Sequence, residues 1–184
     1  ESGGSPSFSP VLFAALCSQH LRVAVDRLAR HKRLIAPMRV VSTTTAEGFE
    51  VSWAWDDPTI RSPRLLAAIE LITLTRIART GVGARVVPLQ VTSPVPLGAE
   101  RAHARFFGTR VTVGDHTAIR FRLEDAERPF VPLPQAMWRR VEPDLQRRRG
   151  LRDAAVPVSE RTHAALLASL PGGELTLAGT ARQM

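Results

Sequence analysis

Large apolar residues occupy every second position between 49 and 55. The apolar positions are Phe49, Val51, Trp53 and Trp55. A period of two is typical of a strand that buries one face. The β-branched run 38–45 precedes this segment, and Glu47-Gly48 between them favours a turn. This part of the chain therefore predicts a β-hairpin with one aromatic face.

A second alternating segment follows a short helical one. Residues 99–107 favour a helix that ends at Gly108, because glycine readily adopts the left-handed conformation that closes a helix. The runs 110–113 and 117–123 favour strands, and Gly114-Asp115 between them is a good turn pair. We therefore predict a second hairpin here.

One more extended run covers residues 85–92. Val87, Leu89 and Val91 lie on one side of it. Pro88 has no N–H to donate to a neighbouring strand. The run is therefore expected at a sheet edge, or as a locally irregular strand.

Helical periodicity marks four further segments, which are residues 10–16, 18–36, 62–80 and 135–149. The first and third begin with a serine–proline pair, in which serine caps the helix and proline takes the first helical position. Ser18 is the expected cap of the second. Pro37 and Gly81 are expected to end the second and third, and Pro143 to kink or cut the last.

Glu70 stands among the apolar residues of the 62–80 segment. We expect it at the edge of the apolar stripe, paired with an arginine or in contact with water. A buried glutamate with a raised pKa would instead indicate a functional site, but the pattern suggests no partner for one.

The apolar positions of the strands share one parity, which gives the sheet one apolar face. Because the predicted strands come in antiparallel pairs with helices between them, we predict an α+β fold. It has an antiparallel sheet of about four to five strands, helices packed on one face, and a helical C-terminal extension. The expected organisation is a flexible tail at 1–9, a main domain at 10–149, a linker at 150–158, and a helical extension at 159–184.

The chain has 184 residues, a net charge of +8 and a hydrophobic content of 44%. Its cationic residues are arginines except for Lys32, and they are spread along the chain rather than gathered in one motif. They favour a solvated surface over a phosphate-binding patch.

The single cysteine, Cys17, excludes a disulfide within the chain. We find no leader and no apolar run long enough for a membrane span, and we expect a cytoplasmic protein. The first residue is Glu1, so the true start of the protein could lie before it.

Motifs for catalysis are absent from the sequence. It contains no phosphate-binding loop, no nucleophile elbow and no zinc-binding His-Glu-x-x-His. The five histidines are scattered and have no other ligand type at metal spacing. We therefore predict no catalytic residue, no metal site and no cofactor.

The order of several motifs carries a resemblance. They are PVLFAALCS, RLARHKRLI, WAWDDP, LLAAIELITL, RFFGTRV, an Arg-Pro-Phe loop and AMWRRVEPDL. In this order they resemble the N-terminal, arabinose-binding-like regulatory domain of AraC/XylS-type transcription regulators. The tail LLASLPGGELTLAGTARQM is similar to the family's approach to its helix-turn-helix, with Thr176, Leu177 and Ala181 in the matching places.

The resemblance implies an effector-sensing and dimerising domain of a cytoplasmic bacterial regulator. Its partners would be a small-molecule effector and a second copy of the chain. DNA would be bound only by a C-terminal helix-turn-helix domain, which begins at Thr176 and continues past Met184. Two alternatives stay open: a dimerisation module without a ligand, and a small α+β enzyme.

Five residues are our candidates for effector contact. Trp53, Trp55, Phe107 and Phe121 would supply apolar contact, and Arg120 would bind an anionic group. The alternative is that the aromatic side chains simply form the core.

Overall fold

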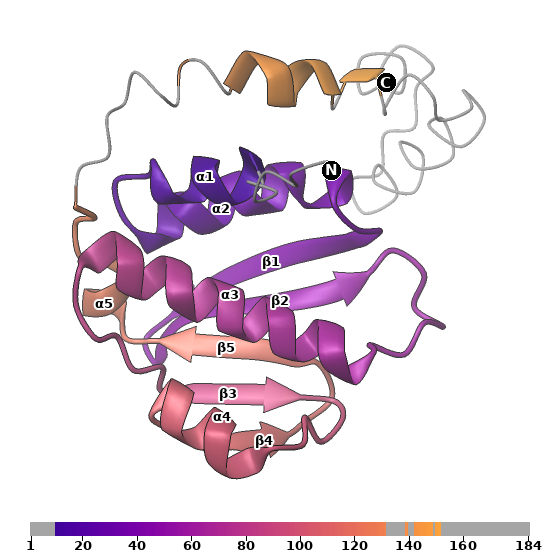
Figure 1. The fold of residues 1–184 in the computed structure, drawn as a ribbon, viewed down its shortest axis with the longest axis vertical. Coiled ribbons are helices and arrows are strands. Elements are labelled where there is room, and N and C mark those ends of the chain that lie inside the picture. Colours follow the sequence, from indigo (N-terminus) through magenta and orange to yellow (C-terminus); the bar gives the residue numbers. More distant parts are fainter. Residues whose placement is uncertain (1–9, 132–138, 140–141, 149, 152–184) are drawn as a thin grey trace, which may run out of the picture. The chain divides into compact units, whose positions relative to one another are not determined.

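A five-stranded sheet forms the centre of the molecule, which was analysed as a computed structural model (Figure 1). The structure describes residues 10–131, 139, 142–148 and 150–151. The chain divides into two compact units, residues 1–145 and 146–184. All labelled helices and strands belong to the first unit.

The strands lie in the order β1-β2-β5-β3-β4. Their bounds are Met38–Thr45 for β1, Gly48–Trp55 for β2, Gln90–Ser93 for β3, Val111–Val113 for β4 and Thr117–Phe121 for β5. β1 and β2 form the predicted antiparallel hairpin, in which Val40 faces Trp53. β5 continues the sheet antiparallel to β2 and places Phe121 beside Phe49.

The predicted hairpin between 110–113 and 117–123 is wrong. β3 lies between the two strands, with Val91 beside Val111 on one side and beside Ile119 on the other. The turn crosses the end of β3, where the Gly114 backbone N–H donates to the Ser93 carbonyl at 3.1 Å. The turn signal was correct, but it does not determine whether the strands that it joins are adjacent.

The extended runs at 85–92 and 117–123 are shorter than predicted. Val86 is buried and Leu89 is exposed, so the expected face of Val87, Leu89 and Val91 does not form, and β3 begins only after Pro88. At the other run, Leu123 starts helix α5, Leu123–Glu127, where a loop was expected. Two acidic residues in the first turn of α5 favour the N-terminal end of a helix.

Helices α1 (Pro10–Leu16), α2 (Leu21–His31) and α3 (Arg64–Val82) pack on one face of the sheet, and the short η1 (Lys32–Leu34) follows α2 (Figure 1). The second helix does not begin at Ser18. The hydroxyl of Ser18 donates to the Ala14 carbonyl and so completes α1 instead of capping α2.

The third helix does not end at Gly81. It continues to Val82, and the following Gly83, with a φ of +68°, closes the helix through its N–H to the Arg79 carbonyl. Gly81 has a different role. A Cβ atom there would come within 2.5 Å of the Phe130 ring, so glycine lets this ring pack against the helix.

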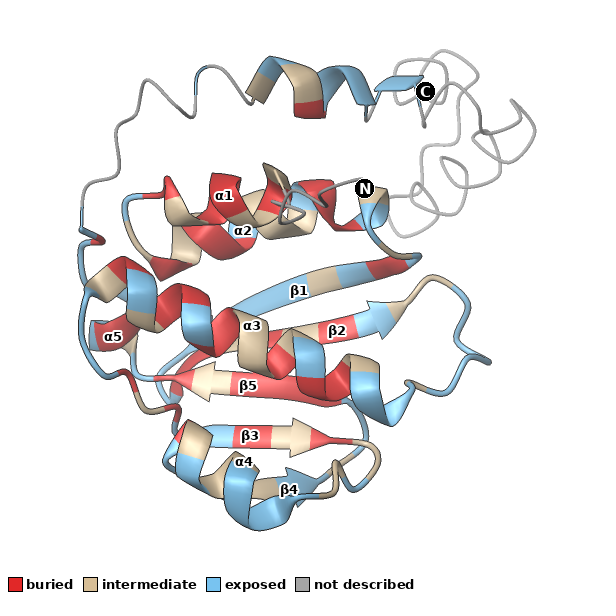
Figure 2. Cartoon of the chain, in the orientation of Figure 1, coloured by how far each residue is buried: buried red, intermediate tan, exposed pale blue. Residues whose placement is uncertain are grey.

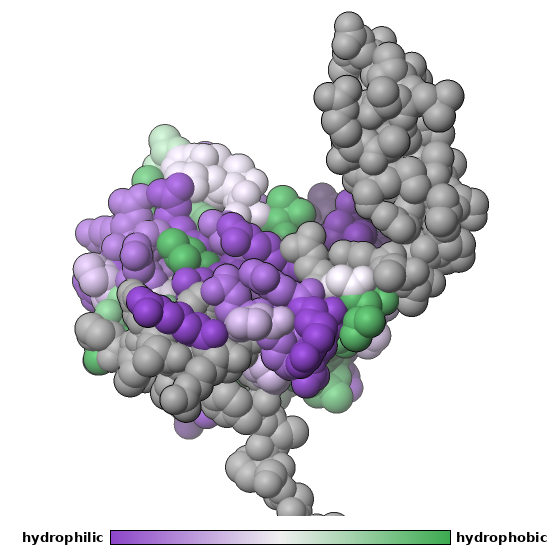
Figure 3. Space-filling model, turned by 90° about the horizontal axis from the view of Figure 1, so that it is seen from above, coloured by the Kyte–Doolittle hydropathy of each residue, from purple (hydrophilic) through white to green (hydrophobic). Residues whose placement is uncertain are grey.

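The α+β class and the helices on one face of the sheet are confirmed. Figure 2 shows the buried residues concentrated between the sheet and α3. On the face seen in Figure 3, hydrophobic residues form small patches separated by hydrophilic ones. Residues 142–148 are helical, and Leu145 packs against Val11 and Ala14. The rest of the predicted helix at 135–149, the tail at 1–9 and the segment after residue 151 lie outside the described residues.

Candidate effector groove

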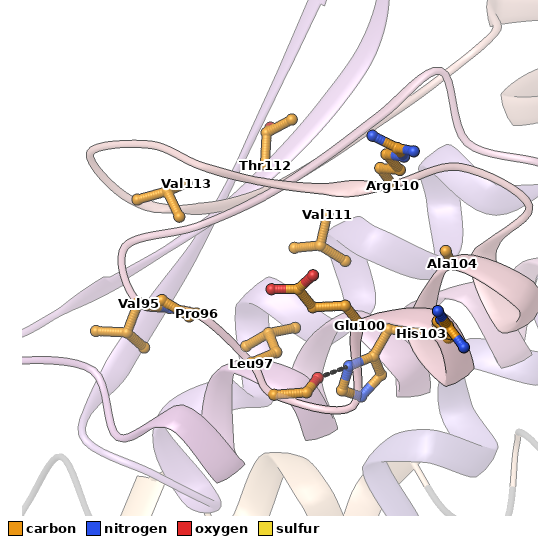
Figure 4. A pocket seen from close by; sticks show the side chains of 12 residues that line it. Val95, Pro96, Leu97, Glu100, His103, Ala104, Arg110, Val111, Thr112 and Val113 are labelled. Carbon is orange, nitrogen blue, oxygen red and sulfur yellow. Dashed lines mark hydrogen bonds between the residues drawn. The ribbon is translucent and has the colours of Figure 1, made fainter.

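A groove of about 540 Å³ lies between the loop 95–98, the helix α4 (Glu100–Phe107) and the edge strand β4 (Figure 4). Its apolar wall consists of Val95, Pro96, Leu97, Ala104, Val111 and Val113. Its polar lining consists of Glu100, Arg101, His103, Arg110 and Thr112. This volume lies within the usual range of small-molecule sites, about 300–1,000 Å³.

The turn into α4 shapes one end of the groove. Gly98 has a φ of +71° and Ala99 a φ of +43°, and Ala99 is the only non-glycine residue with a positive φ in the described part of the chain. The left-handed conformation is unfavourable for a residue that carries a Cβ atom. The turn is held by His103, whose Nδ1 lies 2.8 Å from the Gly98 carbonyl oxygen.

The contact with Gly98 fixes the role of each His103 nitrogen. A carbonyl oxygen only accepts hydrogen bonds, so Nδ1 carries the hydrogen and donates it. In the neutral imidazole Nε2 is then left as an acceptor. The ring lies at the side of the groove, below Glu100 (Figure 4).

Charged side chains line the groove without neutralising one another. Glu100, Arg101 and Arg110 form no ion pair with any residue that the structure describes. The Glu100 carboxylate lies between Leu97 and Val111, as Figure 4 shows. The groove thus offers free hydrogen-bond acceptors and cations beside an apolar wall.

A second, much smaller cavity lies in the core under the helices. It measures about 30 Å³, and its wall includes Trp53, Val51, Lys32 and Glu70. This volume suits about one water molecule. Lys32 Nζ donates to Glu70 Oε1 at 2.5 Å, and the two side chains are only 7% and 14% exposed.

The expectation for Glu70 therefore needs correction. Its partner is neither an arginine nor bulk water but Lys32, the only lysine of the chain. The pair joins η1 to α3, which are separated by two strands in the sequence, so helical periodicity alone could not suggest it.

The structure does not bring the five predicted effector residues together in one site. Phe107 and Phe121 are fully buried in the core, and Trp53 is 8% exposed at the wall of the small cavity. Trp55 is half-buried, and its Nε1 has no hydrogen-bond partner among the described residues. Arg120 lies on the opposite face of the sheet from Phe121, since neighbours on a strand point to opposite faces.

Arg120 is held by two carboxylates. Its Nη1 lies 2.9 Å from Glu47 and its Nη2 lies 2.8 Å from Glu50. The sequence analysis did not select the groove residues, because they come from a loop, a short helix and a three-residue strand with no shared periodicity.

The amino-acid sequence identifies the family of this chain. Residues 4–130 match the model of the "Arabinose-binding domain of AraC transcription regulator, N-term". The chain belongs to this family. It is therefore a regulatory domain of an AraC-type transcription regulator, and the family is one of regulators rather than of enzymes.

The fold agrees with this assignment. The structure is similar to the transcriptional regulator CdpR from Pseudomonas aeruginosa, with a TM-score of 0.54 and 16% sequence identity. The match covers 94% of this chain and 58% of CdpR, so the chain spans little more than half of that protein's length. Among curated proteins, none is significantly similar in sequence.

Two features are absent from the residues that the structure describes. Within them, no three histidine, cysteine, aspartate or glutamate side chains are grouped so that they could hold a metal ion. None of the helices described combines the length and the apolar character that crossing a membrane requires.

Proposed function

We propose that the groove beside α4 receives the small-molecule effector of this regulatory domain. The observation that carries the proposal is the set of uncommitted polar groups around an apolar wall. Glu100 and, in the neutral imidazole, the Nε2 atom of His103 can accept hydrogen bonds from a ligand, and Arg101 and Arg110 can donate them. A sugar or sugar acid has hydroxyl groups for the acceptors and an apolar ring face for Leu97 and Val111.

In this proposal the domain is a two-state element. An effector shifts the equilibrium between two conformations only as far as its affinities for them differ. The turn at Ala99 is the element that we expect to change, since its left-handed backbone is unfavourable without compensating contacts. The linker at 150–158 and the helical extension at 159–184 would pass the change to a C-terminal DNA-binding domain, in the cytoplasm.

The five residues selected from the sequence remain a prediction for effector contact. An effector that reached Trp53 or Phe121 would have to open the core, because both side chains are buried. Arg120 would have to exchange Glu47 and Glu50 for the ligand. The groove requires neither change, and we therefore favour it.

Isothermal titration with a panel of pentoses and their sugar acids, beginning with L-arabinose, tests the proposal. We expect one class to bind, and Glu100→Gln to weaken its binding about tenfold or more, because a hydrogen bond to a charged group contributes about 1.5–3 kcal/mol. Glu124→Gln is the matched control, because Glu124 is exposed on α5 and does not line the groove. Equal affinities of the two variants would contradict the groove as the site.

A second candidate function, a dimerisation module, is favoured by β1. This strand is at the edge of the sheet, and residues 41–45 are all exposed. The free edge of a β-branched strand is a template for pairing with another strand. Light scattering on the chain and on Val41→Lys tests it: we expect a dimer that the lysine converts to a monomer. A dimer that persists in this variant would place the interface elsewhere.

A further inference from the structure

A second recess lies at the C-terminal end of α4. It has a volume of about 560 Å³ and is open to solvent, between the end of α3 and the end of α4. Its lining residues are Arg79, Gly83, Ala84, Arg85, Arg105 and Phe106. It shares no residue with the effector groove.

Arg79 forms a fixed floor of this recess. Its Nε donates to the Val86 carbonyl at 2.9 Å and its Nη2 to the Phe107 carbonyl at 3.2 Å. The guanidinium carbon lies 4.9 Å from the centre of the Phe106 ring. Three contacts therefore hold the guanidinium plane in one orientation, and Nη1 makes none of these bonds.

Two more arginines border the recess without a counter-ion. Arg85 and Arg105 form no ion pair with any residue in the described ranges, and the lining contains no acidic residue. Burial, and then the charge of Arg85, lower the pKa of the Arg79 guanidinium. The positive charges of Arg79 and Arg85 therefore oppose each other in the absence of an anion.

The position of Arg79 near the C-terminal end of α3 explains only part of this clustering of three arginines. Cations near a helix C-terminus are stabilised by the helix dipole, and Arg79 also satisfies two carbonyl groups. Arg105 belongs to a different helix, and neither it nor Arg85 has a described hydrogen-bond partner. No described contact of Arg85 or Arg105 therefore accounts for their position beside Arg79.

We propose that this recess binds the phosphate group of a small organic phosphate. Guanidinium groups form paired, charge-assisted hydrogen bonds with phosphate oxygens. A phosphate dianion has enough charge and enough acceptors to engage three arginines, whereas a single carboxylate has not. The site is independent of the effector groove and of the ligand proposed there.

Isothermal titration of the whole chain with pyrophosphate, at constant ionic strength, is the test. We expect binding, and a loss of about tenfold or more in affinity in both Arg85→Gln and Arg105→Gln. Arg61→Gln is the control, because it removes the same charge from an exposed residue outside the recess, and we expect it to bind like the wild type. Thermal unfolding without ligand should be nearly the same in all four proteins.

Three outcomes would overturn the proposal. The first is no binding at millimolar pyrophosphate by a folded wild-type chain. The second is an equal loss in the Arg61→Gln variant, which would indicate only a general effect of net charge. The third is Arg85-dependent binding of a 20-base-pair DNA duplex that pyrophosphate does not displace, which would assign the recess to nucleic acid.

Discussion

Charged side chains line both the small cavity in the core and the effector groove. Those of the cavity form an ion pair with each other, whereas those of the groove form none among the described residues. In the cavity, Lys32 is buried, Glu70 is only 14% exposed, and the two side chains are paired with each other. In the groove, Glu100, Arg101 and Arg110 are exposed and form no ion pair among the described residues. The cavity holds about one water molecule, whereas the groove is large enough for a metabolite.

The difference separates the structural role of the buried pair from the binding role that we propose for the groove. A buried charge without a partner is costly, so removing either member of a buried pair destabilises the fold. An exposed charge is solvated, so it remains available to a ligand at little cost to stability. Variants in the cavity should therefore change the free energy of unfolding, and variants in the groove should change affinity.

The largest expected effect is that of Glu70→Ala. It leaves the Lys32 ammonium buried without its counter-ion, and we expect a loss of about 3–5 kcal/mol in the free energy of unfolding. Urea denaturation measures it. The double variant Lys32→Met/Glu70→Leu should recover much of the loss, because it removes both charges and fills the space.

The exposed pair of Arg22 and Glu127 is the control for that experiment. Its atoms are 2.7 Å apart, but the side chains are 42% and 55% exposed. Arg22→Ala should cost less than about 1 kcal/mol. Similar losses for Glu70→Ala and Arg22→Ala would show that burial is not what distinguishes the inner pair.

A glycine-to-alanine exchange extends the comparison to packing. In Gly81→Ala the new Cβ would overlap the Phe130 ring, so the ring or the helix must move. We expect a net loss of about 1–2 kcal/mol, after allowing for alanine's better helix propensity. Gly114→Ala, next to β4, should change stability by less than about 0.5 kcal/mol, because its Cβ would make only ordinary contacts with Thr92 at 3.5 Å. Equal thermal unfolding midpoints for the two variants would contradict this packing.

Arg120→Ala should have a smaller effect. Arg120 is 27% exposed, and its partners Glu47 and Glu50 are 75% and 30% exposed. We expect a loss of about 0.5–1 kcal/mol that decreases as salt is added, because exposed ion pairs are screened. Urea denaturation at low and high salt measures it, and a loss that does not depend on salt would indicate a packing role instead.

The smallest expected effect on stability is that of Glu100→Gln. The carboxylate has no described ion-pair partner, so the free energy of unfolding should change by less than about 0.5 kcal/mol. Urea denaturation of the free protein measures this change. A loss as large as that of Glu70→Ala would mean that Glu100 has a structural role.

Local patterns predicted most of the elements but not how distant ones meet. The alternation around Trp53 identified β2, and Gly108 correctly marked the end of α4. The insertion of β3 between β4 and β5 depends on contacts between residues about 20 to 30 positions apart in the sequence, which no local period records. The Lys32–Glu70 pair and the groove depend in the same way on residues brought together by the fold.

The aromatic residues chosen from the sequence differ in burial from the residues that line the groove. Phe107 and Phe121 fill the core, as large apolar side chains usually do. The groove is lined instead by aliphatic residues and by charges that are scattered in the sequence. Which charges remain without a partner becomes visible only in three dimensions.

An NMR titration of the ¹⁵N-labelled chain with the sugar and sugar-acid panel tests the central claim most directly. The account predicts shifts in the backbone amides of residues 97–104 and 111–113, which surround the groove, while the indole signal of Trp53 stays in place. Shifts of the Trp53 indole signal with unchanged groove amides would contradict it and would place the effector in the core.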